Sequence, residues 1–539
     1  MALHDPDPAV ALDAARLYVE SLEALARKPS PVACFDDMTE DVPRLRAVHC
    51  TDTSPDRDGE ACILLDKMQV DVLRLRAQKL VEQGDKLALD AKGTRALFDE
   101  GGRAYSEIFR EHCQARLADQ RPLATTPAVC AEMAYNSARA FRAAHLLAKA
   151  IVAYRALLLF DDRAKAGSPL AVKAVYELGQ SYRALALYEQ AAAHLERYAA
   201  MNPRAYDADR AITDAVVLRL GLGDDAQATK DVASFTRTWG TTKRAEAAQL
   251  VFALARHHVE RKAWSKANTV LVGSLAMLDR GPVDLTIRAH ALLARIAIES
   301  NDPARATTEF AKVRAMWSDP AAAQLAIRHG WPGEDEQQIS KRVATCALAV
   351  GEAMWNAAED QRVAEVEPLK LPPFTGPAER SAIMAYTQTK VRPWFEKKRS
   401  AIEKAEAEYV RILDIKPYPP PTWVIAAGAA VGSMWSDFAD DFVRVPIPDA
   451  WRRSPALYGA YYDALDQMSE PIKAGRAKPA MKKCLELAVR FQVDDARTRV
   501  CDAWLAKTYK AEHHLLDEII PSFRGTGLEA RALAAPVGP

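Results

Sequence analysis

The stretch from Val172 to Ala205 places small and large residues in an order typical of two tightly packed antiparallel helices. Gly179 and Ala191 leave almost no side chain at the point where such helices meet. Pro203 closes the stretch, because proline cannot continue a helix. Large residues stand beside the small ones and fill the adjacent space: Val175, Leu178, Tyr182 and Leu195. The pattern predicts a helix, a short turn and a second helix that returns along the first.

Weaker copies of the same pattern occur on both sides of this stretch. The small residue of the second helix recurs at spacings of 41, 37, 39 and 39, at Ala150, Ala191, Ala228, Ala267 and Ala306. A large residue follows four positions later at Tyr154, Leu195, Val232, Leu271 and Phe310. The position of Gly179 is occupied by Ala138, Gly179, Val216, Ala255 and Ala294. Five registers predict ten antiparallel helices between about Ala128 and Trp317, in irregular repeats.

These residues resemble the tetratricopeptide repeat (TPR) family, whose consensus has Leu-Gly, Tyr, Ala and Pro at the corresponding spacings. The resemblance implies an all-α solenoid of antiparallel helix pairs, with an additional helical region toward the carboxy terminus. Tyr198 stands where the family usually has alanine, so we expect this repeat to pack less closely against the next one.

Length and charge restrict the class of protein further. A chain of 539 residues exceeds a single compact core, which agrees with a solenoid. We expect four regions: an amino-terminal helical region with a cysteine-containing loop (1–127), the TPR-like block (128–317), a long-helix arm with a proline-rich linker (318–415), and a carboxy-terminal helical region with a flexible tail (416–539). Lys plus Arg and Asp plus Glu both number 72, so no global field favours nucleic acid.

The amino-terminal region contains recognisable helix boundaries. Asp7-Pro8 predicts an N-cap followed by the first helical residue. The run from Thr51 to Gly59 has the composition of a loop. Apolar residues at helical spacing predict a helix from Leu64 to about Val81, and a second helix is expected over Thr94 to Leu117.

Two long helices are predicted after the repeats, over about Asp335 to Ala364 and Arg380 to Ile415. The linker from Glu367 to Pro377 lies between them, and the prolines after Lys416 end the second helix. We expect an arm or hairpin that can protrude as a docking surface.

The apolar segment from Trp423 to Trp435 is too short to cross a bilayer, so it predicts a buried helix. Gly428 and Gly432 permit close packing of that helix.

Compartment depends on the eight cysteines. The first residues lack a basic region and an apolar core, so we expect no signal peptide. No stretch is long enough to cross a bilayer, so we expect no direct membrane insertion. Spacing allows disulfides between Cys113 and Cys130 and between Cys484 and Cys501, and leaves the pairing of Cys34, Cys50 and Cys62 open. Paired cysteines favour a periplasm or envelope, whereas free thiols favour the cytoplasm.

The family resemblance also implies which residues line a partner groove. TPR proteins use positions 2, 5, 9 and 12 of each first helix, and here those positions are rich in arginine with interleaved aromatic rings. We therefore expect a protein partner, in particular an acidic peptide segment. The carboxylate-clamp form of the repeat has Asn at position 9, where this chain has Arg139 and Gln180, so that form is disfavoured. The expected partner-binding residues are Tyr135, Arg139, Arg142, Lys173, Tyr176, Arg183, Phe252, Arg256 and Arg295.

Catalysis has little support in the sequence. The best metal-ligating material is Glu512-His513-His514 with Asp517, or His257-His258 with Glu260, and neither forms a His-Glu-x-x-His motif. We therefore predict no enzyme activity, no cofactor and no metal.

The chain as a whole resembles large TPR proteins of the deltaproteobacterial and myxobacterial cell envelope, through its repeats, its proline-rich linker and its Pro-Ile-Pro loop. The prediction is a protein-binding scaffold; a regulatory or substrate-recruiting subunit of an enzyme complex is the alternative, and a metal-dependent enzyme is less favoured.

Overall fold

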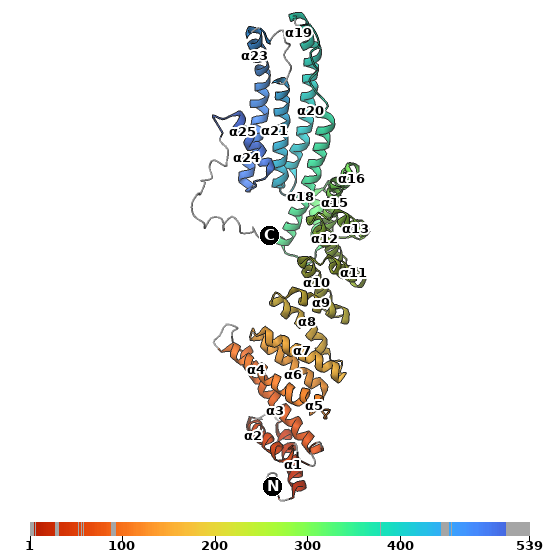
Figure 1. Ribbon diagram of the computed structural model, residues 1–539, viewed down its shortest axis with the longest axis vertical. Coiled ribbons are helices and arrows are strands. Elements are labelled where there is room, and N and C mark those ends of the chain that lie inside the picture. The colour runs from red at the N-terminus through yellow and green to blue at the C-terminus, as the bar shows by residue number, and fades with distance from the viewer. Residues whose placement is uncertain are drawn as a thin grey trace. The chain divides into compact units, whose positions relative to one another are not determined.

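The computed structural model describes residues 5, 7–26, 32–51, 53–54, 57, 59–87, 93–377, 379–443, 452–453 and 455–513. Every regular element in these ranges is a helix, which confirms the all-α fold class (Figure 1). The chain divides into two compact units, Met1–Lys243 (unit 1) and Arg244–Pro539 (unit 2). The division falls inside the predicted repeat block, and the boundaries at 127, 317 and 415 stay predictions.

Unit 1 begins with helices α1 (Pro8–Ala26), α2 (Val32–His49) and α3 (Glu60–Asp85), which share one apolar core. The backbone N–H of Ala9 donates to the Asp7 carboxylate at 2.9 Å, as expected for an N-cap. Helix α3 contains the predicted segment from Leu64 to Val81 and extends beyond it at both ends. Helix α2 lies in the region predicted to be helical, but its bounds were not predicted, because its acidic residues and Pro43 break the apolar periodicity.

The predicted helix from Thr94 to Leu117 is confirmed as a continuous run of α4 (Thr94–Ile108), a π-turn η1 (Phe109–Gln114) and α5 (Ala115–Ala118). Helix α4 packs against α3 on one side and against α6 on the other. Two adjacent glycines make both contacts possible: a methyl group on Gly101 would meet Val81, and one on Gly102 would meet Phe141, each at 2.8 Å. The pair α3 and α4 therefore precedes the first repeat directly.

The repeat helices follow the predicted pairs. In unit 1 they are α6 (Pro127–Ala143), α7 (Leu147–Ala164), α8 (Pro169–Ala184), α9 (Tyr188–Met201), α10 (Ala208–Leu222) and α11 (Asp225–Trp239). In unit 2 they are α12 (Arg244–Glu260), α13 (Trp264–Gly273), α14 (Leu275–Leu278), α15 (Val283–Glu299) and α16 (Pro303–Met316). The expectation of ten helices is wrong at one place, where α13 and α14 replace a single helix. The helix breaks at Gly273-Ser274, because both residues have low helix propensity.

Burial confirms the repeat register. Each of the five alanines predicted at the helix contact is buried, and so is the large residue four positions later in every pair. At Gly179 the two helices lie very close: a methyl group there would lie 2.8 Å from Cγ of Leu195 and 3.4 Å from the carbonyl oxygen of Ala191. The small residues therefore set how near the two helices of a pair can lie.

The turns inside the pairs repeat as regularly as the contacts. Each first helix ends at a residue in the left-handed region, with φ between 57° and 76°, at His145, Ala186, Gly223, Lys262 and Asn301. These five residues stand five positions before the five contact alanines and share their spacing. In every turn two backbone N–H groups return to carbonyls of the preceding helix; for example, Ala186 donates to Arg183 at 3.0 Å and Leu187 to Tyr182 at 2.9 Å. This is the hydrogen-bond pattern of a Schellman C-cap.

Unit 2 continues with a bundle of long helices (Figure 1). Both predicted long helices are confirmed: the first is α18 with η2, and the second is a continuous run from α19 to η4. The elements are α17 (Pro320–Gly330), α18 (Glu336–Gln361), η2 (Arg362–Val366), α19 (Arg380–Tyr386), η3 (Thr387–Val391), α20 (Arg392–Val410), η4 (Arg411–Asp414), α21 (Pro421–Val443), α23 (Pro455–Ile472), η5 (Lys473–Ala477), α24 (Lys478–Phe491) and α25 (Ala496–Thr508).

Helix α18 does not protrude as an arm. It packs against α15 and α16 of the last repeat and against α20 and α21. The apolar stripe that predicted the helix is the surface that these neighbours cover, since Val343, Ala347 and Val350 are all buried. The repeats and the long helices of unit 2 therefore share a continuous packed interior.

Helix α21 is the buried helix expected from the segment between Trp423 and Trp435. Its glycines permit the predicted close packing, because a methyl group on Gly428 would lie 3.3 Å from Cβ of Cys484 on α24. A methyl group on Gly432 would lie 2.8 Å from Sδ of Met481 on the same helix. None of the described helices is long and apolar enough to span a membrane.

Candidate functional site

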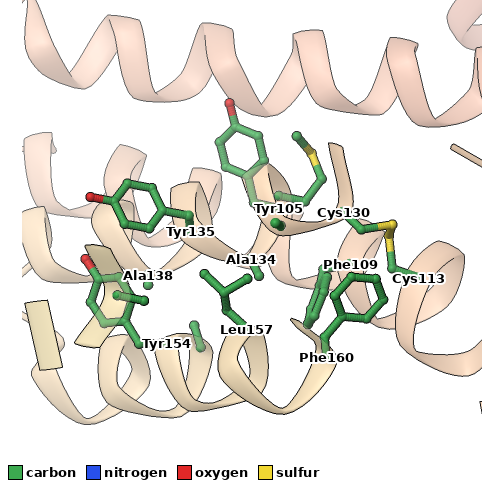
Figure 2. Packing of buried hydrophobic residues seen from close by; sticks show 14 of the residues in the cluster. Tyr105, Phe109, Cys113, Cys130, Ala134, Tyr135, Ala138, Tyr154, Leu157 and Phe160 are labelled. Carbon is green, nitrogen blue, oxygen red and sulfur yellow. A yellow bond between two sulfur atoms is a disulfide. The ribbon is translucent and has the colours of Figure 1, made fainter. Parts of the chain in front are cut away.

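The predicted partner-binding residues of unit 1 lie on α6 and α8, the first helices of two successive pairs, and Arg210 lies on α10, the first helix of the next pair. We call the surface formed by Tyr135, Arg139, Lys173, Tyr176 and Arg210 the A-helix face. Tyr135 is buried with its ring centroid 5.8 Å from that of Tyr154 on α7. Figure 2 shows these two rings at one end of the apolar cluster and the Cys113–Cys130 disulfide at the other. The face is thus anchored in the core of unit 1.

Two of the predicted partner-binding arginines form ion pairs with carboxylates of the next pair. Arg142 on α6 pairs with Glu177 on α8. Arg183 on α8 pairs in the same way with Asp214 on α10, at 2.9 Å. Both arginines stand at position 12 of their repeat, and both carboxylates stand at position 6 of the following one. Sequence reasoning missed these two acids, which stand at the same repeat position in two successive repeats.

Three basic residues of the A-helix face remain exposed. Arg139, Lys173 and Arg210 form no ion pair with any residue in the described ranges. They stand on three successive first helices, and Arg210 is the groove-lining position 2 of the third repeat. Glu177 and Asp214 already neutralise Arg142 and Arg183. The charges of Arg139, Lys173 and Arg210 are therefore the ones that a ligand on this face could use.

The phenols on and beside this face stay neutral at physiological pH. Burial raises the pKa of Tyr154 and, more weakly, that of Tyr135, against the opposing influence of Arg139 and Arg142. Burial also raises the pKa of Tyr176, helped by Asp207. The three phenols therefore add no negative charge, and since Tyr154 and Tyr135 are buried, Tyr176 is the ring that offers apolar surface and a hydroxyl donor at the face. The charge of the face comes from its arginines and lysine.

The three predicted residues in unit 2 have partners within the chain. The guanidinium of Arg295 holds the carboxylate of Glu352 on α18 through both oxygens, at 2.6 and 2.8 Å from Nε. Arg256 pairs with Glu260 on its own helix at 2.9 Å. Phe252 is buried under Arg288, whose guanidinium carbon lies 4.4 Å from the ring centroid. Arg295 therefore joins the last repeat to α18.

Three disulfides join cysteines that are near in sequence. The structure joins Cys113 to Cys130 and Cys484 to Cys501, the two pairs that the spacing suggested. It also joins Cys50 to Cys62, one of the pairings left open among the first three cysteines. The side chain of Cys34 lies outside the described residues. Cys346 is a buried free thiol, and burial raises its pKa.

The residues considered for metal binding do not converge. His513 lies 2.7 Å from the Asp502 carboxylate, whereas His514 and Asp517 fall outside the described residues. The rings of His257 and His258 meet edge to face with centroids 6.0 Å apart. Within the described ranges no group of three or more His, Cys, Asp or Glu side chains is arranged to hold a metal ion.

The spacing of the helix contacts and the C-cap turns inside the pairs together identify the type of repeat. The helix pairs are tetratricopeptide-like. Five helix contacts, each with a small residue, and five matching C-caps repeat at the spacings that the TPR pattern predicted. The TPR-like pairs lie in both units.

Comparisons with known proteins add the following. No family model matches the chain, and no curated protein matches it. Among solved structures, apo RapI is 10% identical, with a TM-score of 0.26 over 75% of this chain and 98% of RapI. A tetratricopeptide repeat protein from Parabacteroides merdae is 12% identical, with a TM-score of 0.19 over 58% of this chain and 98% of its own. A signal-transduction ATPase with a tetratricopeptide repeat sensor from Pyrococcus horikoshii is 11% identical, with a TM-score of 0.22 over 86% of this chain and 74% of its own. These values carry no argument about function.

Proposed function

We propose that this chain is a non-catalytic scaffold that binds an acidic segment of a partner protein across the A-helix face of unit 1. The observation that carries the proposal is the set of three exposed cations on successive first helices, beside Tyr135 and Tyr176, that form no ion pair with the described residues. Carboxylates of a bound segment would form charge-assisted hydrogen bonds with them. A partner-recruiting subunit of an enzyme complex would use the same face, and the identity of the partner distinguishes the two roles.

The ion pairs of the position-12 arginines support this choice of residues. Arg142 and Arg183 are held by Glu177 and Asp214, so they connect successive helix pairs. An extended partner segment that crosses these pairs would meet Arg139, Lys173 and Arg210 in turn. The proposed binding residues are therefore fewer than the sequence suggested, and Arg210 joins them.

We also propose that the protein works in an oxidising compartment, as part of an envelope assembly. Three disulfides support this proposal, because such bonds are rare where thiols are kept reduced. Mass spectrometry of the protein captured from its native cell, without reductant, tests it. Finding the six cysteines as free thiols would contradict it.

The binding proposal is tested by charge reversal on two faces of unit 1. Crosslinking in the native cell followed by mass spectrometry measures partner capture. We expect capture to fall at least about tenfold when three cations of the A-helix face are reversed, because attraction becomes repulsion. That variant is Arg139→Glu, Lys173→Glu and Arg210→Glu.

A matched control carries the same change of net charge on the second helices. Arg155, Arg197 and Lys230 are exposed on α7, α9 and α11, and they form no ion pair with the described residues. Their replacement by glutamate should leave capture within about twofold of the unaltered chain. Equal losses in both variants would mean that only net charge matters, and the proposed face would be wrong.

A further inference from the structure

Unit 2 contains an apolar groove that the proposed binding face does not include. It has a volume of about 1020 Å³ and lies between α17, α18 and the proline run that begins at Pro417. Three large apolar side chains on its walls are open to solvent: Leu325 is 54% exposed, Leu348 38% and Tyr418 79%. Apolar side chains gathered in one hollow indicate a place where another segment binds.

The walls of this groove are fixed by buried contacts. Trp331, in the turn between α17 and α18, donates from Nε1 to the Asp284 carboxylate at 2.7 Å. The guanidinium of Arg342 stacks on the same ring at 3.5 Å and holds the other oxygen of Asp284 at 3.0 Å. On the opposite wall, Pro420 packs so closely on Gly351 that a methyl group there would lie 2.6 Å from Cγ of the proline. The groove is therefore preformed.

The charges around the groove favour an acidic occupant. Among the lining residues the one carboxylate, Glu336, is already paired with Arg328. Lys341 in the lining and Lys416 beside Pro417 form no ion pair with the residues that the structure describes. An apolar segment that also carries carboxylates would thus match both the surface and the charge of the groove.

The chain carries such a segment just beyond the last described residue. After His513 the sequence continues His-Leu-Leu-Asp-Glu-Ile-Ile-Pro-Ser-Phe, with two carboxylates, at Asp517 and Glu518, and five large apolar residues. We propose that residues Ile519–Phe523 of this chain bind in the groove between α17 and α18, with Asp517 and Glu518 at its rim on the side of the lysines. The inference concerns another unit and another surface than the proposed function, so each can fail without the other.

The segment can reach the groove within one chain. Helix α25 begins close to the proline run of the groove, because the guanidinium of Arg497 lies 4.9 Å from the ring of Trp423, two residues after the lining residue Pro421. Glu512, just after the helix, bonds Lys478 at 2.9 Å. The 13 residues of α25 rise by about 20 Å, which the chain must cover in returning. Six extended residues span about 20 to 22 Å, so Ile519 is the first apolar residue that arrives.

Because the segment is attached to the same chain, even weak contacts are sufficient to keep it in the groove. A short flexible connection gives its own segment an effective concentration of about 1 mM or more at a site within reach. A groove with modest affinity would therefore be filled by the tail of the same chain before a free partner competes. A partner that binds more tightly would displace the tail, and the groove would then act as a regulated docking site.

The test places a photocrosslinker in the full-length chain at Phe523→benzoylphenylalanine. Irradiation followed by mass spectrometry should give crosslinks to peptides containing Leu325 or Leu348, within chains that migrate as monomers. Crosslinks confined to other surfaces, or crosslinks between two chains, would overturn binding of the tail in its own groove. No crosslink at all above the background of a denatured sample would overturn it as well.

A groove variant and a matched control separate binding from folding. Leu348→Glu places a charge on the apolar wall and should lower the groove crosslinks at least about tenfold. Val489 on α24 is also exposed, at 69%, and does not line the groove. Val489→Glu should leave the crosslinks unchanged, with both variants melting within about 3 °C of the parent. Equal crosslinking in the two variants would contradict the proposal.

Discussion

Gly179 lies so close to Leu195 that a methyl group on the glycine would be 2.8 Å from Cγ of the leucine. Helices α8 and α9 can therefore pack at this distance only when the first carries no side chain here. We expect Gly179→Leu to lower the free energy of unfolding by about 1 to 3 kcal/mol, because it overpacks the contact. Urea unfolding of the purified protein measures the loss.

Gly221 provides the control for this substitution. It lies in α10, and a methyl group there would meet nothing within 4 Å. Gly221→Leu makes the same chemical change on an open helix surface and should be neutral or stabilising, by up to about 1 kcal/mol from helix propensity alone. Equal losses at both positions would mean that the contact between α8 and α9 does not set the spacing of this pair.

The left-handed turn residues give a prediction with opposite signs at equivalent positions. Ala186 and Gly223 end α8 and α10 with φ of 57° and 76°, a conformation that costs a residue with a β-carbon about 1 kcal/mol. Ala186→Gly should therefore stabilise the protein by up to about 1 kcal/mol, and Gly223→Ala should destabilise it by a similar amount. Shifts of Tm in the same direction for both would contradict the common C-cap geometry.

The repeat contacts could be predicted from sequence because they depend on side-chain size at neighbouring helices. A small residue at Gly179 or Ala191 has a local steric meaning, and its recurrence fixes the register of every pair. The break between α13 and α14 was missed because Gly273 and Ser274 lower helix propensity without forbidding a helix. The bounds of helix α2 were not predicted for a related reason, since its contacts with α1 and α3 outweigh a weak local pattern.

The partner-binding residues could be predicted only as positions on a face. The pattern placed Arg142 and Arg183 correctly on first helices, but a single helix does not reveal which group lies across from it. Glu177 and Asp214 come from the next pair and neutralise those arginines. Whether a surface charge is available to a ligand therefore depends on the neighbouring helices, and the shared repeat position of Glu177 and Asp214 was the sign of it in the sequence.

Arg295 should matter for stability rather than for partner binding. Its guanidinium bonds both oxygens of Glu352, whose side chain is largely buried on α18. Arg295→Met leaves that carboxylate without its partner and should cost about 1 to 3 kcal/mol of unfolding free energy. Arg295→Met with Glu352→Gln should recover part of the loss. Unchanged stability with reduced partner capture would instead restore Arg295 to the binding residues.

The buried carboxylate of Asp231 predicts a pH dependence in unit 1. Asp231 on α11 accepts a hydrogen bond from Gln227 at 2.9 Å and lies near Glu196 of α9, which Arg219 of α10 holds at 2.6 Å. Burial, followed by repulsion from Glu196, raises the pKa of Asp231 to about 7. The folded protein therefore favours the protonated form more strongly than the unfolded chain does, whose aspartates titrate near pKa 3.9.

It follows that Asp231 lowers stability progressively as the pH rises from about 4 to about 7, and that the loss is complete above pH 7. Asp231→Asn keeps the shape of the side chain and removes its charge. We expect it to change the free energy of unfolding little at pH 4 and to raise it at pH 8 by a few kcal/mol, at about 1.4 kcal/mol for each unit of pKa shift. Urea unfolding at both pH values measures the difference. A gain at pH 4 as large as that at pH 8 would show that the substitution acts through packing, and that Asp231 is not the titrating group.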